Sequence, residues 1–471
     1  MELPQIIQGG MGAGVSTWKL ARSVAAKGQI GVVSGTALDL IMARRLELGD
    51  PGGHMRRALD AFPYADVSRR IMDRYFVPGG KSPDNPFSAK PMVGRKRSRH
   101  VDELLIAANF AEVFLAKEGH RGIVGINYLH KIECPLLPSL YGAMLARVDA
   151  VIVGAGIPIE IPRIIDGLTR GEPVELSLPV RDGGGGQSYK LEFDPERVLA
   201  EPTLVLPRPR FYPIVSSVLL ATIMAKKCRG RVDGLIVEGP TAGGHNAPPR
   251  VKGDLSPQGE PVYGPRDVID LAAVSAIGLP FWLAGSYGRP AQLRNARAAG
   301  AAGVQVGTLF AFCEESGLRD DLKRDVIAHC SDDTRRVFTD AVASPTGYPF
   351  KVLPIPGTLS DEDEYKKRQR VCDLGYLREA FERSDGKLGW RCAAEELDIY
   401  GRKRGDGKDT HGKKCLCNAL MANIGMAQVR RDNQRELPLV TCGDEVSSIR
   451  YVAGASKKSY KASDVIDYLL S

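Results

Sequence analysis

Residues 235–246 have the sequence LIVEGPTAGGHN, in which a short apolar run leads into a glycine-rich segment that ends in a histidine and an asparagine. The apolar run is typical of a strand buried in a parallel sheet, and glycines after it are typical of loops that follow barrel strands. Imidazole titrates near neutral pH, so His245 at the carboxyl end of such a strand can accept or return a proton. A glycine turn with a solvated histidine would have the same sequence, so the interpretation needs support from other segments.

Two further strand and loop units follow along the chain. Residues 280–288 (PFWLAGSYG) and residues 303–309 (GVQVGTL) both run from apolar residues into small ones. Residues 289–300 (RPAQLRNARAAG) lie between them and predict a helix, with Pro290 in its first turn and Gly300 at its end. Free backbone N–H groups at helix starts bind anions, and barrels often bind phosphate between strands seven and eight. We therefore expect a phosphate site in these loops.

The whole chain offers eight short strand candidates that are rich in valine and isoleucine, each followed by a helical pattern or an insertion. They are residues 5–8, 31–34, 122–127, 150–153, 211–216, 234–237, 281–284 and 304–307. Eight strands are what a closed (β/α)8 TIM barrel requires, and the phosphate-type loops follow the seventh and eighth. The sequence therefore predicts a TIM barrel, with an open, doubly wound sheet as the alternative.

Five motifs in order along residues 1 to 315 resemble the nitronate monooxygenase and 2-nitropropane dioxygenase family, which includes flavin-dependent enoyl reductases. They are residues 6–12 (IIQGGMG), 125–127 (GIN), 242–245 (AGGH), 284–286 (AGS) and 306–308 (VGT). The resemblance implies a barrel that binds FMN and oxidises alkyl nitronates, or a related carbanion-forming substrate, with O2. A flavin-dependent enoyl-thioester reductase, and a flavin-binding electron-transfer or scaffold subunit, are the two alternatives.

The resemblance also implies which residues form the site. His245 would stand over the flavin as the catalytic acid or base, and ten other residues would bind FMN: Gly9, Gly10, Met11, Asn127, Gly243, Gly244, Gly285, Ser286, Gly307 and Thr308. Gly285, Ser286, Gly307 and Thr308 would hold its phosphate. The monooxygenases of the family commonly have a glutamate before the AGGH motif, whereas this chain has Thr241.

The chain of 471 residues is longer than a minimal barrel of about 250 residues. We predict a barrel domain over residues 1–343, with insertions near residues 75–100 and 173–201, and a C-terminal extension over residues 344–471. Alternating patterns at residues 174–178 and 189–193 predict a β-hairpin with a glycine-rich tip at residues 183–186. Residues 344–351 are a connector that could cross the barrel mouth, so that Tyr348 and Lys351 touch substrate.

Four cysteines lie close together in the extension: Cys372, Cys392, Cys415 and Cys417. Thiolates are ligands of structural zinc and of iron–sulfur clusters, so this density raises the hypothesis of a metal site of either kind. None of the spacings is C-x-x-C, and free cysteines are also common small core residues, so packing thiols are the alternative.

The net charge of +8 is modest for this length and is not accompanied by aromatics within a basic cluster, so we expect a small-molecule substrate and no nucleic acid. The longest apolar stretch, residues 213–225, is too short to span a membrane, and the start of the chain shows no secretory signal. Nine cysteines, an odd number, favour reduced thiols. We therefore expect a cytoplasmic protein that binds no membrane, and the sequence leaves a homo-oligomer open.

Overall fold

The computed structural model describes residues 3–182, 188–199, 205–251, 253–330, 335–430, 433–454 and 458–471. Eight strands in this part of the chain form one parallel sheet with the order β1-β11-β10-β9-β8-β4-β3-β2. Their bounds are β1 Ile6–Gln8, β2 Gly31–Ser34, β3 Val124–Leu129, β4 Ala150–Gly154, β8 Arg210–Val215, β9 Leu235–Glu238, β10 Phe281–Ala284 and β11 Gly303–Val306. All eight predicted strands are confirmed.

The two ends of this sheet meet, which makes it a barrel. Ile7 of β1 forms a parallel bridge with Ile30, the residue just before β2. The Gln8 N–H donates to the Ile30 carbonyl at 2.9 Å, and the Ile30 N–H donates to the Ile6 carbonyl at 3.0 Å. In an open sheet with this strand order, the edge strands β1 and β2 would not meet, so the predicted TIM barrel is confirmed.

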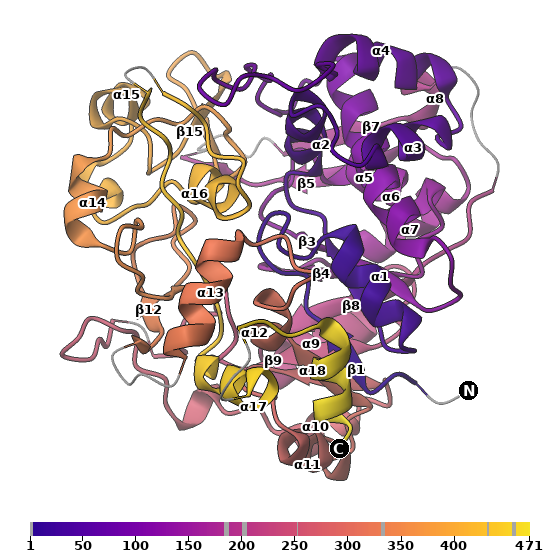
Figure 1. The fold of residues 1–471 in the computed structure, drawn as a ribbon, viewed down its shortest axis with the longest axis vertical. Coiled ribbons are helices and arrows are strands. Elements are labelled where there is room, and N and C mark those ends of the chain that lie inside the picture. The colour runs from indigo at the N-terminus through magenta and orange to yellow at the C-terminus, as the bar shows by residue number, and fades with distance from the viewer. Residues whose placement is uncertain are drawn as a thin grey trace.

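Helices follow most of the barrel strands and cover the outside of the barrel (Figure 1). They are α1 Trp18–Ala26, α2 Leu38–Glu47, α3 His54–Asp60, α4 Ala65–Tyr75, α5 Arg99–Lys117, α6 Leu136–Leu145, α7 Ile161–Thr169, α8 Pro195–Val198, α9 Val218–Lys227, η1 Pro265–Asp267, α10 Leu271–Ser275, α11 Pro290–Ala298, α12 Thr308–Ala311 and α13 Asp320–His329. The helix predicted between the last two barrel strands is α11, and it has Pro290 at its first turn as expected.

Large side chains fill the inside of the barrel at its amino-terminal end. Ile7, Ile152, Tyr212, Ile236 and Trp282 are fully or almost fully buried in one cluster, and the Trp282 indole N–H donates to the Pro4 carbonyl at 2.9 Å. A packed interior at this end leaves the carboxyl ends of the strands as the place for a cavity, as in other TIM barrels.

The predicted β-hairpin is confirmed. Strands β5 (Val174–Leu178) and β7 (Tyr189–Phe193) pair antiparallel, with Val174 opposite Phe193 and Leu178 opposite Tyr189. The predicted glycine-rich tip, residues 183–186, lies outside the described residues. Between the two strands, β6 (Val180–Arg181) pairs with a strand of the C-terminal segment, β14 (Glu379–Glu382).

The C-terminal segment returns to the barrel instead of extending away from it. Its elements, with the strand that precedes it, are β12 Phe338–Asp340, β13 Phe350–Val352, α14 Glu362–Lys367, β14 Glu379–Glu382, β15 Leu388–Arg391, α15 Leu397–Arg402, η3 Gly407–Thr410, α16 Leu416–Asn423, η5 Val446–Ser448, α17 Ile449–Ala453 and α18 Ala462–Leu469. Helix α18 contacts α1, α11 and α12, and α14 to α16 form a group beside the N-terminal helices (Figure 1).

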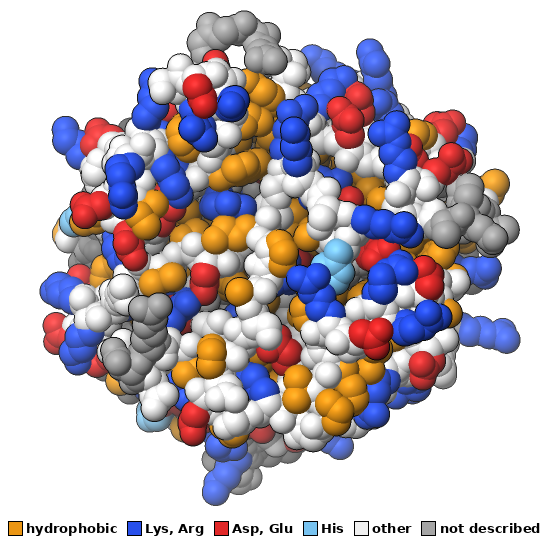
Figure 2. Space-filling view, turned by 90° about the horizontal axis from the view of Figure 1, so that it is seen from above, with side chains coloured by type: hydrophobic (Ala, Val, Ile, Leu, Met, Phe, Trp, Pro, Cys, Tyr) orange, Lys and Arg blue, Asp and Glu red, His pale blue; other side chains and the backbone are white. Residues whose placement is uncertain are grey.

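The outer surface mixes charges of both signs. On the face in Figure 2, basic and acidic side chains are interspersed with hydrophobic ones, so the net positive charge is not gathered there into one patch. No helix among the described residues is both long and apolar enough to cross a membrane.

Candidate active site

A cavity of about 230 Å³ opens at the carboxyl ends of the barrel strands. All eight strands or the loops after them contribute to it, and so does the C-terminal segment. Of the predicted site residues, those that line it are Gly9, Gly10, Met11, Asn127, Gly243, Gly244, His245, Gly285, Gly307 and Thr308. Ser286 does not line it. The structure therefore brings ten of the eleven residues predicted for flavin binding or catalysis to one place.

The turn after β1 is held by Ser16. Its hydroxyl donates to the Gly9 carbonyl at 2.8 Å and accepts from the Met11 N–H at 2.8 Å. A Cβ atom added to Gly10 would lie 2.3 Å from the Cβ of Asn127, so this turn and β3 touch without room for a side chain. Asn127 donates to the Gly10 carbonyl at 3.1 Å, while its buried Oδ1 has no partner among the described residues.

Backbone hydrogen bonds with residues 349–351 hold the loop that carries His245 in place. The Asn246 N–H donates to the Pro349 carbonyl and the Lys351 N–H to the Gly244 carbonyl, both at 2.9 Å. The imidazole contacts the Phe350 ring edge-on at a centroid distance of 5.0 Å. Its Nε2 lies 2.7 Å from the Ser344 hydroxyl. Both contacts fix the ring at the edge of the cavity.

The His245 imidazole is neutral at physiological pH in this environment. Burial, together with the smaller effect of the positive charge of Lys131, lowers its pKa from 6.5 to about 4. A neutral imidazole can accept a proton, but it cannot donate the proton of an imidazolium near pH 7. The expectation from sequence was a histidine that titrates near neutrality, and the structure instead favours a base.

The loops after β10 and β11 meet at the other side of the cavity. Gly285 has φ +96°, and a Cβ atom there would lie 2.9 Å from the Thr241 hydroxyl, so the position requires glycine. Gly307 precedes α12 without a side-chain cap. The Thr308 hydroxyl accepts from the Gly443 N–H at 2.9 Å. The predicted phosphate loops are thus adjacent, and the C-terminal segment reaches them.

One acidic residue at the cavity was not nominated from sequence. Glu238 is the last residue of β9 and pairs with Ala284 of β10. Its carboxyl group has no hydrogen bond or ion pair with any residue that the structure describes. Burial raises its pKa from 4.5 to about 8. The only sequence signal was its position at the end of a predicted strand.

Comparison with known proteins gives a family for the segment that includes this loop. Residues 209–349, from β8 to the connector that contacts His245, match the family model for nitronate monooxygenase. This segment therefore resembles nitronate monooxygenases, and the match is confined to these residues.

The solved structures that resemble the chain are distant. FabK from Thermotoga maritima is 16% identical, with a TM-score of 0.49 over 99% of this chain and 91% of that one. A nitroalkane oxidase from Streptomyces ansochromogenes is 15% identical, with a TM-score of 0.49 over 99% and 94%. The enoyl reductase domain of MlnA from Bacillus amyloliquefaciens is 12% identical, with a TM-score of 0.47 over 99% and 92%. A search of curated proteins finds no match.

The C-terminal segment covers the cavity with a mostly apolar lid. We use the word lid for the residues after β13 that line the cavity: Tyr376, Leu377, Leu416, Cys417, Leu420, Met421, Thr441, Cys442 and Gly443. Sequence analysis nominated only Cys417 among them, and for a different role. The apolar residue types that line a cavity are the same as those that fill a core, so the sequence alone did not distinguish these residues.

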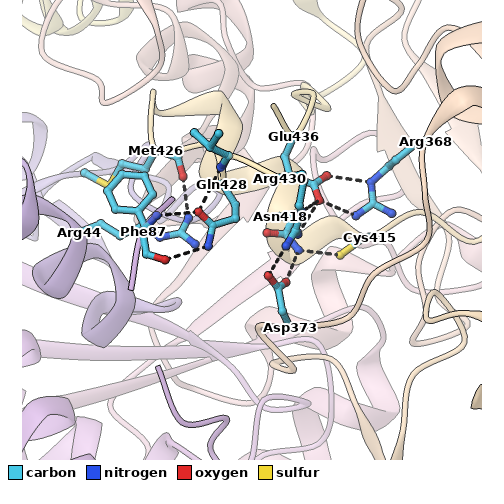
Figure 3. A network of polar contacts seen from close by, with 11 residues as sticks. Arg44, Phe87, Arg368, Asp373, Cys415, Asn418, Met426, Gln428, Arg430 and Glu436 are labelled. Atoms are coloured by element: carbon cyan, nitrogen blue, oxygen red, sulfur yellow. Dashed lines mark hydrogen bonds and ion pairs between the residues drawn. The ribbon is translucent and has the colours of Figure 1, made fainter. Parts of the chain in front are cut away.

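A polar network anchors the lid (Figure 3). The Glu436 carboxylate accepts from Arg368 and Arg430, and Arg430 also donates to Asp373 at 2.6 Å. Asn418 of α16 donates to the same Asp373 at 2.7 Å. Because α16 carries four of the nine lid residues, this network fixes the position of a large part of the lid.

A second group of contacts ties the lid to the barrel helices. Arg44 of α2 donates to the Met426 carbonyl at 2.6 Å, and Phe87 and Gln428 exchange two hydrogen bonds at 2.8 and 3.1 Å (Figure 3). The Tyr376 hydroxyl donates to Asp39 at 2.8 Å. These bonds attach the lid to the barrel through Tyr376 and through Met426 and Gln428, which follow α16.

The connector of residues 344–351 contacts the site through other residues than expected. Phe350 lines the cavity, whereas Tyr348 and Lys351 do not. Lys351 is buried and pairs with Asp444 at 2.7 Å, and the Tyr348 ring lies 4.0 Å from the Lys131 ammonium. The prediction that Tyr348 and Lys351 touch substrate is wrong for this arrangement, because each has a protein partner outside the cavity.

The metal hypothesis for Cys372, Cys392, Cys415 and Cys417 is not supported. The four thiols do gather in one small cluster around Ala394, but no group of three or more metal-ligating side chains within the described residues could hold an ion. The Cys372 and Cys392 thiols hydrogen-bond to each other. Burial raises the pKa of Cys415 and Cys417, which disfavours the thiolates that a metal needs.

Proposed function

We propose that this chain binds FMN and oxidises alkyl nitronates, or a related carbanion-forming substrate, with O2, with His245 as the base. The observation that supports this most directly is the convergence of the glycine turn after β1, Asn127 and the His245 loop on one cavity. The fit to a flavin is argued from the turn itself, since a flat ring can lie against backbone where a Cβ atom would collide. The unpartnered Asn127 Oδ1 offers a hydrogen-bond acceptor to such a ring.

In this proposal Gly9, Gly10, Met11, Asn127, Gly243 and Gly244 would contact the ring, and Gly285, Gly307 and Thr308 would hold the phosphate. Ser286, which does not line the cavity, would act only through the shape of its loop. Bound FMN would accept electrons from the substrate. The chain would hold the substrate beside His245, take a proton from its carbon, and exclude water through the lid.

The test combines a spectrum with a substrate assay. Purified protein should be yellow and should take up oxygen when an alkyl nitronate is added. His245→Ala should slow the proton-dependent step by roughly 100-fold and leave flavin binding intact. His411→Gln, at an exposed histidine, is the control and should behave as the unchanged protein. A colourless protein that takes up no FMN would refute the proposal.

The apolar lid favours one second candidate, an enoyl-thioester reductase. Leu377, Leu416, Leu420 and Met421 give the cavity a hydrocarbon-lined side suited to an acyl chain. Nicotinamide-dependent consumption of an enoyl thioester, with no oxygen uptake on nitronates, would favour this candidate over the first.

A further inference from the structure

Among the described residues, Glu238 is the one that separates the main cavity from a smaller cavity behind the loop after β9, because it lines both. The second cavity has a volume of about 20 Å³ and lies behind the loop after β9. Its other lining residues are Ser216, Gly239, Pro240, Ala247, Pro248, Arg250, Tyr263 and Asp267. A cavity of this size with polar walls can hold one water molecule.

We propose that Glu238 is the proton donor of the active site and that it recovers its proton from water in the second cavity. The inference rests on the enoyl-thioester reductase of the proposed function, because a substrate carbon becomes carbanion-like and takes up a proton in that reaction. It adds to that function the acid that supplies this proton and the route by which the acid is reset.

The surroundings of Glu238 suit an acid. Its carboxyl group has no charged or hydrogen-bonding partner within the described part of the chain, so nothing there stabilises the carboxylate. The titratable or charged side chains around the two cavities are Tyr128, His245, Tyr376, Cys417, Cys442, Arg250, Tyr263 and Asp267. Of these, Arg250 donates to the Ser216 carbonyl and not to Glu238, and the Tyr263 hydroxyl donates to the Ala247 carbonyl.

The pKa values of the two titratable groups on β9 and its loop are shifted in opposite directions. Burial raises the pKa of Glu238 to about 8 and lowers the pKa of His245 to about 4. Near pH 7 the carboxyl group is therefore protonated and the imidazole is neutral. Two groups whose environments separate their pKa values in this way divide the acid and base roles between them.

The proton step balances without a redox change in the protein. The O–H bond of Glu238 breaks, its electron pair stays on the carboxylate, and the new bond uses the electron pair of the carbanion-like atom. The carboxylate is then reprotonated through the water of the second cavity, which passes on one proton and takes one from solvent. In the nitronate reaction, where a carbon atom loses its proton, His245 is the acceptor and Glu238 donates nothing to that carbon.

Infrared difference spectroscopy tests the protonation state directly. We expect the carbonyl stretch of a protonated carboxyl group at pH 7, its loss as pH rises through about 8, and its absence in Glu238→Gln. Glu172→Gln, at an exposed glutamate paired with Arg170, is the control and should leave this band unchanged. A band that is missing in the unchanged protein, or that persists in Glu238→Gln, would overturn the inference.

Kinetics test the role. Glu238→Gln should bind flavin normally and slow the proton-donating step by roughly 100-fold, while Glu238→Asp, which keeps the acid, should recover part of the rate. If Glu238→Gln does not fold, Glu238→Asp carries the test through the infrared band and its pH dependence. A yellow Glu238→Gln protein with an unchanged rate would overturn the inference alone, whereas unchanged protein that takes up no FMN would overturn the proposed function.

A third variant tests the route. Ser216→Leu should fill the second cavity, so the first turnover should keep its rate and later turnovers should slow, because Glu238 is no longer reset. Equal rates for first and later turnovers in this variant would refute the second cavity as the source of the proton.

Discussion

Replacing Glu436 by glutamine should destabilise the protein measurably, because Glu436 is the shared acceptor of the network that anchors the lid. Its side chain is 3% exposed and accepts four hydrogen bonds, two from Arg368 at 2.8 and 3.1 Å and two from Arg430 at 2.8 and 2.6 Å. Removing one partner of a buried ion pair costs about 3–5 kcal/mol, because the remaining charge is left without compensation. Arg368 and Arg430 are 11% and 22% exposed, so water can partly compensate them, and the low end, about 3 kcal/mol, applies.

The assay is thermal unfolding of Glu436→Gln beside the unchanged protein. An unfolding entropy of about 2.1 cal/mol/K per residue gives roughly 1 kcal/mol/K over 471 residues, so a loss of about 3 kcal/mol should lower Tm by about 3 °C. Glu364→Gln, which loses a surface pair with Lys367, is the matched control and should change the free energy of unfolding by no more than about 0.5 kcal/mol. Equal Tm values for Glu436→Gln and Glu364→Gln would show that the network does not stabilise the folded protein by anchoring the lid.

Two other predictions concern the cavity. Gly10→Ala should weaken FMN binding at least tenfold in a fluorescence titration, because its Cβ would lie 2.3 Å from the Asn127 Cβ, whereas Gly401→Ala, with open space around the added atom, should bind FMN normally. Equal affinities in the two variants would contradict the close approach of turn and strand. The rate of the step that uses His245 as a base should stay constant from pH 7 down to about 5 and fall near pH 4, since protonation of the folded state removes the base only there. Between pH 6.5 and 4 the unfolded state binds a proton at His245 that the folded state does not, so the free energy of unfolding should decrease as pH falls. In His245→Gln this pH-dependent contribution should be absent. A rate that already falls near pH 6.5 would show that the imidazole is not buried as the structure indicates.

The barrel could be predicted from sequence because its strands are buried on both faces. Such strands appear as short runs of valine and isoleucine, and each is followed by glycines where the chain turns into a loop. The closure of β1 against β2 could not be derived from these local patterns, since the bridge joins Ile7 to Ile30 across a helix. The sequence signals for closure were the count of eight strands, the phosphate-type loops after the seventh and eighth, and the family resemblance.

The sequence motifs identified most of the barrel residues that line the cavity, but not Glu238 or the apolar lid. Gly10 and Gly285 stand where a Cβ atom would collide with a neighbour, so these two positions require glycine. Glu238 directly follows the predicted strand 234–237, but its lack of a charged partner depends on the loops that surround it. The division of labour between Glu238 and His245 is therefore a property of the folded environment.

The cysteine-rich part of the C-terminal segment shows how a composition signal can be misread. Four thiols within a short stretch suggested metal ligation, yet they pack around Ala394, and Cys417 faces the main cavity. The sequence could not distinguish these roles, because both gather small sulfur-containing side chains in the interior.

The barrel loops and the C-terminal segment line different sides of the cavity. This suggests that one part of the chain carries out the reaction and the other selects the substrate. The barrel loops supply the backbone turns, Asn127, Glu238 and His245, whereas the C-terminal segment supplies most of the apolar wall. Substitutions in the lid, such as Leu420→Ala, should therefore change KM for substrates of different chain length more than they change the rate of proton transfer. Since the Asp373 and Glu436 network holds α16, weakening that network should also change KM for substrates of different chain length, although the network does not line the cavity. A lid that shapes the substrate pocket and a barrel that performs the reaction can then vary independently.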